Sequence, residues 1–163
     1  MLRPDIKERW ASPLPTLYLN NEDQEAMLAW AGMRAHLDGP WPEHAKALGV
    51  YEAETGKLRA VLVTVETYSG IIDCHFASDG SKTWATRNIL RGLFGYVFKV
   101  RKAHRIQTVS PASNRAILRV DLALGWQCEG TARDAMGPGQ DGVIFGMTPE
   151  TCIWLKDDDH GIR

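Results

Sequence analysis

The chain has 163 residues, a length within the range of one compact domain, and its 19 Lys and Arg against 20 Asp and Glu leave a formal net charge of -1. No global field therefore draws the protein to nucleic acid or to an anionic membrane, so any basic site must be local. The 44% hydrophobic fraction is ordinary for a globular protein, and the apolar runs are far too short to cross a bilayer.

The N-terminal stretch and the cysteines bear on the compartment. Residues 1–10 carry dispersed charges and no apolar stretch of the kind that a secretory signal needs, which predicts a cytoplasmic protein. The cysteines Cys74, Cys128 and Cys152 are odd in number and lack CxxC spacing, which disfavours a disulfide framework and a zinc site. We therefore expect buried thiols and no metal. The acidic run at 157–159 resembles a metal cluster only superficially, because adjacent side chains rarely converge on one ion.

The first half of the chain predicts an arm, a helix and three strands. Residues 1–19 hold three prolines and no sustained periodicity, so we expect an irregular arm. Helical spacing of apolar residues predicts a helix over 21–37, capped by Asn20 or Asn21. These apolar residues are Ala26, Met27, Trp30, Met33 and Leu37. A Gly-Pro-Trp-Pro stretch then breaks the helix, and the strands are predicted at 47–54, 58–68 and 71–77, with a hairpin turn between the first two.

The second half begins with the most regular pattern in the sequence. Apolar residues between 89 and 98 recur at i, i+1, i+4 and i+5, which predicts a long core-facing helix over about 83–102. The remaining elements are predicted as a strand at 105–110, a helix at 113–124, and strands at 126–135 and 142–147. The order is α-β-β-β-α-β-α-β-β. No linker or repeat divides it, so we expect one domain over 20–156 followed by a flexible tail at 157–163.

A more specific signal lies in residues 114–133, which read N-R-A-I-L-R-V-D-L-A-L-G-W-Q-C-E-G-T-A-R. The asparagine, the Leu-Gly-Trp and the Glu-Gly-x-x-Arg resemble a run in GNAT N-acetyltransferases that modify ribosomal proteins and peptides. The D-G-V-I-F-G-M run at 141–147 resembles the last strand of those enzymes, and Cys152 with Trp154 adds a resemblance to GNAT-like proteins of phage genomes. The resemblance covers about residues 47–155.

This resemblance implies an α+β fold with a mixed, mostly antiparallel sheet, helices on both of its faces and splayed central strands. It implies an acetyl-CoA-dependent N-acyltransferase whose acceptor is a primary amine of a protein, a peptide or a small molecule. A homodimer stays open. In this family the pantetheine arm of the cosubstrate runs along the end of the third predicted strand, here Phe76, Ala77 and Ser78.

The resemblance also places the CoA pyrophosphate at the loop that opens the long helix. The candidate residues there are Gly80, Ser81, Lys82, Thr83, Trp84 and Arg87. A loop of this kind can supply N–H donors and positive potential, although an ordinary capped helix start is the alternative interpretation. Asn114 is a further candidate, either as a pantetheine contact or as a helix cap, and both roles are compatible.

Acylation requires a neutral amine, so a base must accept a proton. His75 and Glu66 are the candidate bases because the resemblance places their strands along the acceptor cleft, and Tyr68 is a third candidate. Strand alternation puts His75 and Asp73 on the face opposite the apolar one. A solvent-exposed position without catalytic role is therefore the alternative for His75.

The chain departs from the family pattern twice. The pyrophosphate motif [QR]-x-x-G-x-[GA] is absent from residues 78–84, and Asp121 stands where many members have a general-acid tyrosine. We expect Asp121 to be ionised and not to act as the acid. These departures motivate the alternative of a GNAT-like protein without catalysis, acting as a binding or virion-associated component.

Three smaller expectations complete the sequence analysis. A bulge is predicted at Gly130, with Arg133 pairing with Glu129 or Asp134 or meeting the acceptor. Packing roles are predicted for the tryptophans Trp84, Trp126 and Trp154. The balanced charge disfavours a nucleobase or transfer RNA substrate, although a local basic patch keeps that alternative open. The patch consists of Lys99, Arg101, Lys102, His104 and Arg105.

Overall fold

The computed structural model describes residues 14–35 and 39–156 of the chain, which form one sheet of seven strands in the order β1-β2-β3-β4-β5-β7-β6. The strands are β1 Leu17–Asn20, β2 Lys46–Glu52, β3 Leu58–Tyr68, β4 Ile71–Ser78, β5 Arg105–Pro111, β6 Gln127–Gly137 and β7 Gln140–Met147. The helices are α2 Gln24–Ala35, α3 Arg87–Gly95, which continues into the π-helical turn η1 Tyr96–Val100, and α4 Arg115–Ala123. The predicted α+β architecture with a mostly antiparallel sheet is confirmed.

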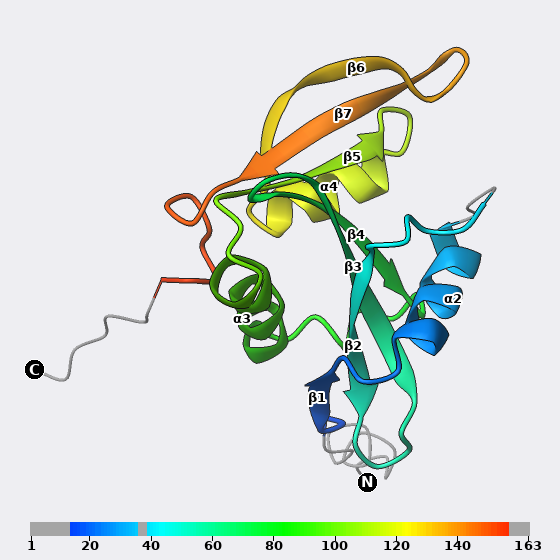
Figure 1. Ribbon diagram of the computed structural model, residues 1–163, viewed down its shortest axis with the longest axis vertical. Coiled ribbons are helices and arrows are strands. Elements are labelled where there is room, and N and C mark those ends of the chain that lie inside the picture. Colours follow the sequence, from blue (N-terminus) through cyan, green and yellow to red (C-terminus); the bar gives the residue numbers. More distant parts are fainter. Residues whose placement is uncertain (1–13, 36–38, 157–163) are drawn as a thin grey trace, which may run out of the picture.

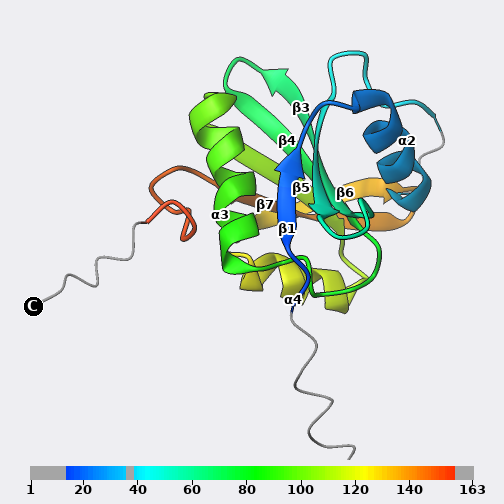
Figure 2. The same ribbon diagram turned by 90° about the horizontal axis from the view of Figure 1, so that it is seen from below.

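Helices cover both faces of the sheet, as the two ribbon views show (Figures 1 and 2). Met27 and Ala31 of α2 are buried against Val61, Val63 and other small apolar residues of β2 and β3. On the opposite face α3 packs on β2, β3, β4 and β5, and α4 lies over β5. No helix in the described ranges is long and apolar enough to span a membrane.

The face of α3 that the sequence pattern predicts to be apolar is buried throughout. Its residues are Ile89, Leu90, Leu93, Phe94, Val97 and Phe98. Phe94 lies at the centre of an aromatic cluster, with ring centroids 6.1 Å from Phe76, 6.0 Å from Trp126 and 6.4 Å from Trp154. Trp84 stacks on Phe76 at 6.5 Å, so the packing roles expected of the three tryptophans agree with their contacts.

Two predicted helix boundaries were wrong. The long helix begins at Arg87 instead of Thr83, because Thr86 caps it by accepting a hydrogen bond from the Ile89 N–H. The helix predicted from 21 begins at Gln24, because Asp23 accepts from the Ala26 N–H, whereas Asn20 accepts from the Glu22 N–H. Met33, expected on its apolar face, is 73% exposed.

The prediction of an irregular arm over residues 1–19 was wrong for its last residues. Residues 17–20 form β1, which pairs antiparallel with β2 and extends the sheet at that edge. Residues 1–13, Leu37, the acidic run at 157–159 and the predicted tail lie outside the described residues.

Two side-chain expectations were also wrong, and one expectation for the same strand was confirmed. Cys128 is exposed on β6, although Cys74 and Cys152 are buried as predicted. Arg133 pairs with neither acid proposed for it in the described structure, because Glu129 binds Arg105. The register of β6 against β7 does shift between Cys128 and Gly130, which confirms the bulge.

The central strands splay as predicted. The parallel pairing of β4 with β5 covers only Ile71 with Arg105, Ile72 with Ile106 and Asp73 with Gln107. From there β4 continues to Ser78 and β5 to Pro111 without further pairing between them. A fork therefore opens in the middle of the sheet.

We predict that Phe94→Ala lowers the free energy of unfolding by about 3–5 kcal/mol, because it removes the central ring of the aromatic cluster and leaves a cavity. Urea denaturation followed by circular dichroism measures the change. Val120→Ala on α4 is the control, since Val120 is 47% exposed and should cost less than about 1 kcal/mol. Equal losses in the two variants would contradict the central packing role of Phe94.

Candidate active site

The fork between β4 and β5 leaves two strand edges without partners. Residues 74–78 of β4 pair with β3 on one side only, and residues 108–111 of β5 pair with β7 on one side only. Backbone N–H and C=O groups at such edges need water or a ligand to satisfy them. An extended ligand that carries amide groups can add to an edge of this kind as an extra strand.

The loop from β4 to α3 has some of its N–H donors occupied and others open. The Gly80 N–H donates to Ser78 Oγ at 3.2 Å, and the Ser81 N–H donates to Asp79 Oδ1 at 2.9 Å. No hydrogen bond within the described part of the chain uses the N–H groups of residues 82–84. Because these groups lie just before the N-terminus of α3, they are the donors of this loop that remain open for an anion.

Arg59 of β3 holds this loop in place. Its Nη2 donates to Ser81 Oγ and to Thr83 Oγ1, each at 3.0 Å, and its guanidinium forms ion pairs with Glu52 and Asp79. The pair with Asp79 is an ionic contact at 2.6 Å without an aligned hydrogen bond from Nε. Burial alone would raise the pKa of Asp79, but hydrogen bonds from Ser81 and the charge of Arg59 lower it on balance.

The other loop candidates differ in what they can offer. Trp84 is 8% exposed and packs on Phe76, so only its backbone faces a ligand readily. Lys82 and Arg87 are exposed on either side of the loop end and contribute positive charge. Gly80 has φ +88°, a conformation that favours glycine.

Asn114 follows the end of β5 and caps α4, since its Oδ1 accepts from the Ile117 N–H at 3.1 Å. The capping interpretation is therefore correct, and Asn114 is exposed. Asp121 lies further along the same helix, α4. It is 8% exposed and accepts a 2.6 Å hydrogen bond from Ser110 Oγ of β5. Burial raises the pKa of Asp121, while the Ser110 hydrogen bond opposes this rise.

We expected Asp121 to be an ordinary ionised carboxyl, but the structure buries it and raises its pKa. A raised pKa favours the protonated form more than the sequence position suggested. In the structure Asp121 is buried on the inward side of α4, whose other residues are exposed or half-buried.

His75 lies just beyond the last paired residues of the fork, on the face of the sheet that carries α2. Its ring centroid is 5.2 Å from that of Trp41. Burial against its neighbours lowers the pKa of His75, and the nearby charge of Asp73 offsets part of this shift. The lowered pKa keeps the imidazole of His75 neutral at pH 7, and the side chain is exposed, so it is accessible as the alternative interpretation expected.

Glu66 is not brought together with His75. It stands opposite Ile72, at the turn end of the β3–β4 hairpin, whereas His75 stands opposite Val63. Glu66 Oε1 accepts from the Gly70 N–H at 2.9 Å, so this carboxylate stabilises the turn. Tyr68, the third candidate, is 74% exposed near the same turn.

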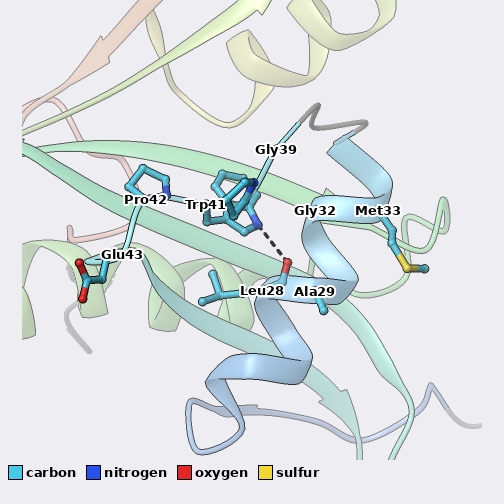
Figure 3. Close-up of a pocket in the computed structure, with 9 residues that line it drawn as sticks. Leu28, Ala29, Gly32, Met33, Gly39, Trp41, Pro42 and Glu43 are labelled. Atoms are coloured by element: carbon cyan, nitrogen blue, oxygen red, sulfur yellow. Dashed lines mark hydrogen bonds between the residues drawn. The ribbon is translucent and has the colours of Figure 1, made fainter.

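Trp41 is a site residue that the sequence analysis missed. Its indole Nε1 donates to the Leu28 carbonyl oxygen at 2.9 Å, which fixes the loop after α2 against that helix (Figure 3). A groove of about 480 Å³ lies on the α2 side of the indole, and a second pocket of about 350 Å³ lies on the His75 side. The only sequence signal was a tryptophan enclosed by two prolines at 40 and 42.

A charged network continues the site across β5 and β6, and this network was also missed. Arg105 Nη1 donates to Glu129 Oε1 at 3.0 Å, its Nη2 pairs with Oε2, and its Nε donates to Gln107 Oε1 at 3.1 Å. The hydrogen bond from Arg105 lowers the pKa of Glu129. Arg105 thus belongs to this network, and the basic patch predicted around it is partly neutralised.

Comparisons with known proteins identify the fold. No family model matches the chain, and no curated protein sequence matches it. A variant of the spermidine N-acetyltransferase of Vibrio cholerae matches with a TM-score of 0.69 and 12% identity, covering 86% of this chain and 96% of that one. A dodecameric structure of a spermidine N-acetyltransferase from the same organism gives 0.64 at 13% identity, with 81% and 93% covered.

A third structure, the spermidine/spermine N-acetyltransferase of Vibrio cholerae in complex with manganese ions, gives a TM-score of 0.61 at 13% identity. It covers 81% of this chain and 92% of that one. These likenesses establish that the chain has the fold of GNAT N-acetyltransferases, as the resemblance implied. The narrower resemblance to ribosomal-protein enzymes and phage proteins stays a prediction.

We predict a pH-dependent stability difference between the native chain and Asp121→Asn. Because the folded pKa of Asp121 is raised, its contribution to stability is full below the unfolded pKa and is lost as pH rises through the folded pKa. The asparagine removes this titration and keeps an acceptor for Ser110 Oγ. The melting temperature of the variant minus that of the native chain should therefore increase from about pH 4 towards neutrality, by roughly 2–4 °C for each kcal/mol.

Differential scanning fluorimetry across this pH range measures the difference. Ser110→Ala is the companion variant, because loss of its hydrogen bond should raise the pKa of Asp121 further and move the transition to higher pH. A difference that stays constant with pH would show that Asp121 has no raised pKa.

Proposed function

We propose that this chain is an N-acyltransferase that moves the acetyl group of acetyl-CoA to a primary amine. The observation that carries the proposal is the fork between β4 and β5, where three residue pairs are followed by two open strand edges. The fold supports the same conclusion, since solved structures that match it include N-acetyltransferases.

The residues around the fork fit this cosubstrate. The open edge at Phe76, Ala77 and Ser78 offers backbone groups to the two amides of a pantetheine arm. The N–H groups of residues 82–84 and the exposed Lys82 offer donors and charge to a pyrophosphate. The exposed amide of Asn114 stands at the end of β5 and is available for a further contact.

The thioester of acetyl-CoA supplies an activated acetyl group. Transfer forms a C–N bond, breaks the C–S bond and requires the amine to lose a proton. His75 is placed to accept that proton, directly or through a water, because its lowered pKa keeps it neutral and it lies beside the fork. Glu66 is the weaker candidate because its carboxylate is bound to the Gly70 N–H.

Calorimetry with acetyl-CoA tests the proposal. We expect binding in the micromolar range, which corresponds to about -8 kcal/mol. No heat and no melting shift at millimolar acetyl-CoA would overturn the proposal. That result would favour a GNAT-like binding component without catalysis.

We predict that Gly80→Val weakens acetyl-CoA binding about tenfold or more, because valine is strained at φ +88° and distorts the loop. Lys82→Ala should weaken it by a smaller factor. The matched control is Gly139→Val, which imposes the same kind of strain at φ +73° in the remote β6–β7 turn. At neither glycine would an added Cβ meet another atom within 4 Å. Unchanged affinity in both loop variants would place the phosphates elsewhere.

We further predict that His75→Ala lowers kcat by roughly a hundredfold while acetyl-CoA affinity is kept. Glu66→Gln should change kcat little and serves as the comparison. The native chain should lose rate at an acidic pH below 6.5 in a step that His75→Ala lacks, because the pKa of His75 is lowered. Release of free CoA thiol, measured with a panel of primary amines, gives the rates. Full activity of His75→Ala would exclude it as the base.

A further inference from the structure

The pocket on the His75 side of Trp41 has a composition that points to a ligand class. It occupies about 350 Å³ and is lined by Pro40, Trp41, Pro42, Val65, Thr67, Asp73 and His75. This volume lies near the lower end of the range of about 300–1,000 Å³ typical of ligand pockets. A narrow aliphatic group fits such a volume better than a large ring system.

Asp73 is the one acidic residue that lines this pocket, and its carboxylate is incompletely satisfied. Asp73 Oδ1 is buried and has no hydrogen-bond partner in the described part of the chain. A buried carboxylate oxygen without a donor is costly, so a cation or a donor is expected to complete the site. Asp73 also forms the last pair with β5, opposite Gln107, which places it at the vertex of the fork.

Arg105 interacts electrostatically with Asp73: the hydrogen bond to Glu129 is the main cause of the raised pKa of Arg105, and the charge of Asp73 adds to it. Its hydrogen bonds nevertheless go elsewhere, with Nη1 and Nη2 on Glu129 and Nε on Gln107. The guanidinium therefore offsets part of the negative charge of Asp73 without satisfying its buried oxygen.

The other walls of the pocket suit the carbon chain of an amine. Trp41 is held by its hydrogen bond to the Leu28 carbonyl oxygen, and its ring lies 5.2 Å from that of His75. An aromatic face attracts a nearby ammonium group, and apolar side chains such as Val65 bury methylene groups. The acidic residue, the aromatic wall and the narrow shape of the pocket thus favour an amine with an alkyl chain.

We propose that this pocket binds a primary alkylammonium group, with Asp73 as its counter-ion and Trp41 packed along its methylene chain. The role of this pocket as an acceptor site rests on the proposed function, whereas its binding of an alkylammonium group does not depend on that function. The alkylammonium belongs to a free alkylamine or to a lysine side chain. In either case the nitrogen lies beside His75, two residues along the same face of β4.

The test is an NMR titration of the full chain with n-butylammonium in the absence of acetyl-CoA, following the Trp41 indole and His75 ring signals. We expect millimolar binding, at least tenfold weaker in Asp73→Asn and several-fold weaker in Trp41→Leu. n-Butanol, which has the same chain without the charge, should not shift these signals. Glu22→Gln, at an exposed acid outside the pocket, is the matched control and should bind as the native chain does.

Two results would overturn the proposal. The first is equal n-butylammonium binding by Asp73→Asn and the native chain, and the second is the absence of NMR shifts at a ligand concentration 50-fold above the expected millimolar dissociation constant. A second titration, with Nα-acetyl-lysine methylamide, distinguishes a lysine side chain from a free alkylamine. Tighter binding than n-butylammonium supports a lysine side chain, and weaker binding supports a free amine. Butylammonium binding in a chain that fails to bind acetyl-CoA would refute the proposed function and retain the site. Acetyl-CoA binding without butylammonium binding would retain the proposed function and refute the alkylammonium site.

Discussion

The limited pairing of β4 with β5 is the constraint on which the rest of the structure depends. Three residue pairs hold the two halves of the sheet together, and beyond Asp73 and Gln107 the strands separate. The separation leaves backbone donors and acceptors open in the interior of a sheet, where they are normally paired.

The two faces that meet at the fork are stabilised by different means. On the α3 face, a cluster of aromatic rings around Phe94 fixes the helix against the strands. The loop that leads into this helix lacks the pyrophosphate motif that the sequence resemblance implied, and it is held by the ion pairs and hydrogen bonds of Arg59. On the α2 face the core residues are mostly alanines and valines, and the indole of Trp41 closes the edge of the site.

Much of this arrangement was predictable because it is encoded locally. The apolar period of α3, the alternation of β4 and the Leu-Gly-Trp run after α4 each identified an element and its buried face. Errors arose where distant contacts decide the outcome. Residues 17–20 form a strand only because the edge of β2 offers them backbone partners, and Trp84 stays outside the helix because it packs on Phe76. The site was harder still, since Asp73, Trp41 and Glu129 acquire their roles from neighbours that are far away in sequence.

The short spacing of Asp73 and His75 couples binding to proton transfer. In the free protein the carboxylate of Asp73 favours the protonated imidazole and works against the burial that lowers the pKa of His75. An ammonium group bound at Asp73 would neutralise that carboxylate and add a positive charge beside the ring, and both effects lower the pKa of His75 further. The imidazole would then be neutral when a cationic acceptor occupies the pocket, which is the state a base needs. A lower pKa also makes His75 a weaker proton acceptor, and an ammonium paired with Asp73 holds its proton more tightly, so the acceptor nitrogen must leave the carboxylate before His75 can take its proton.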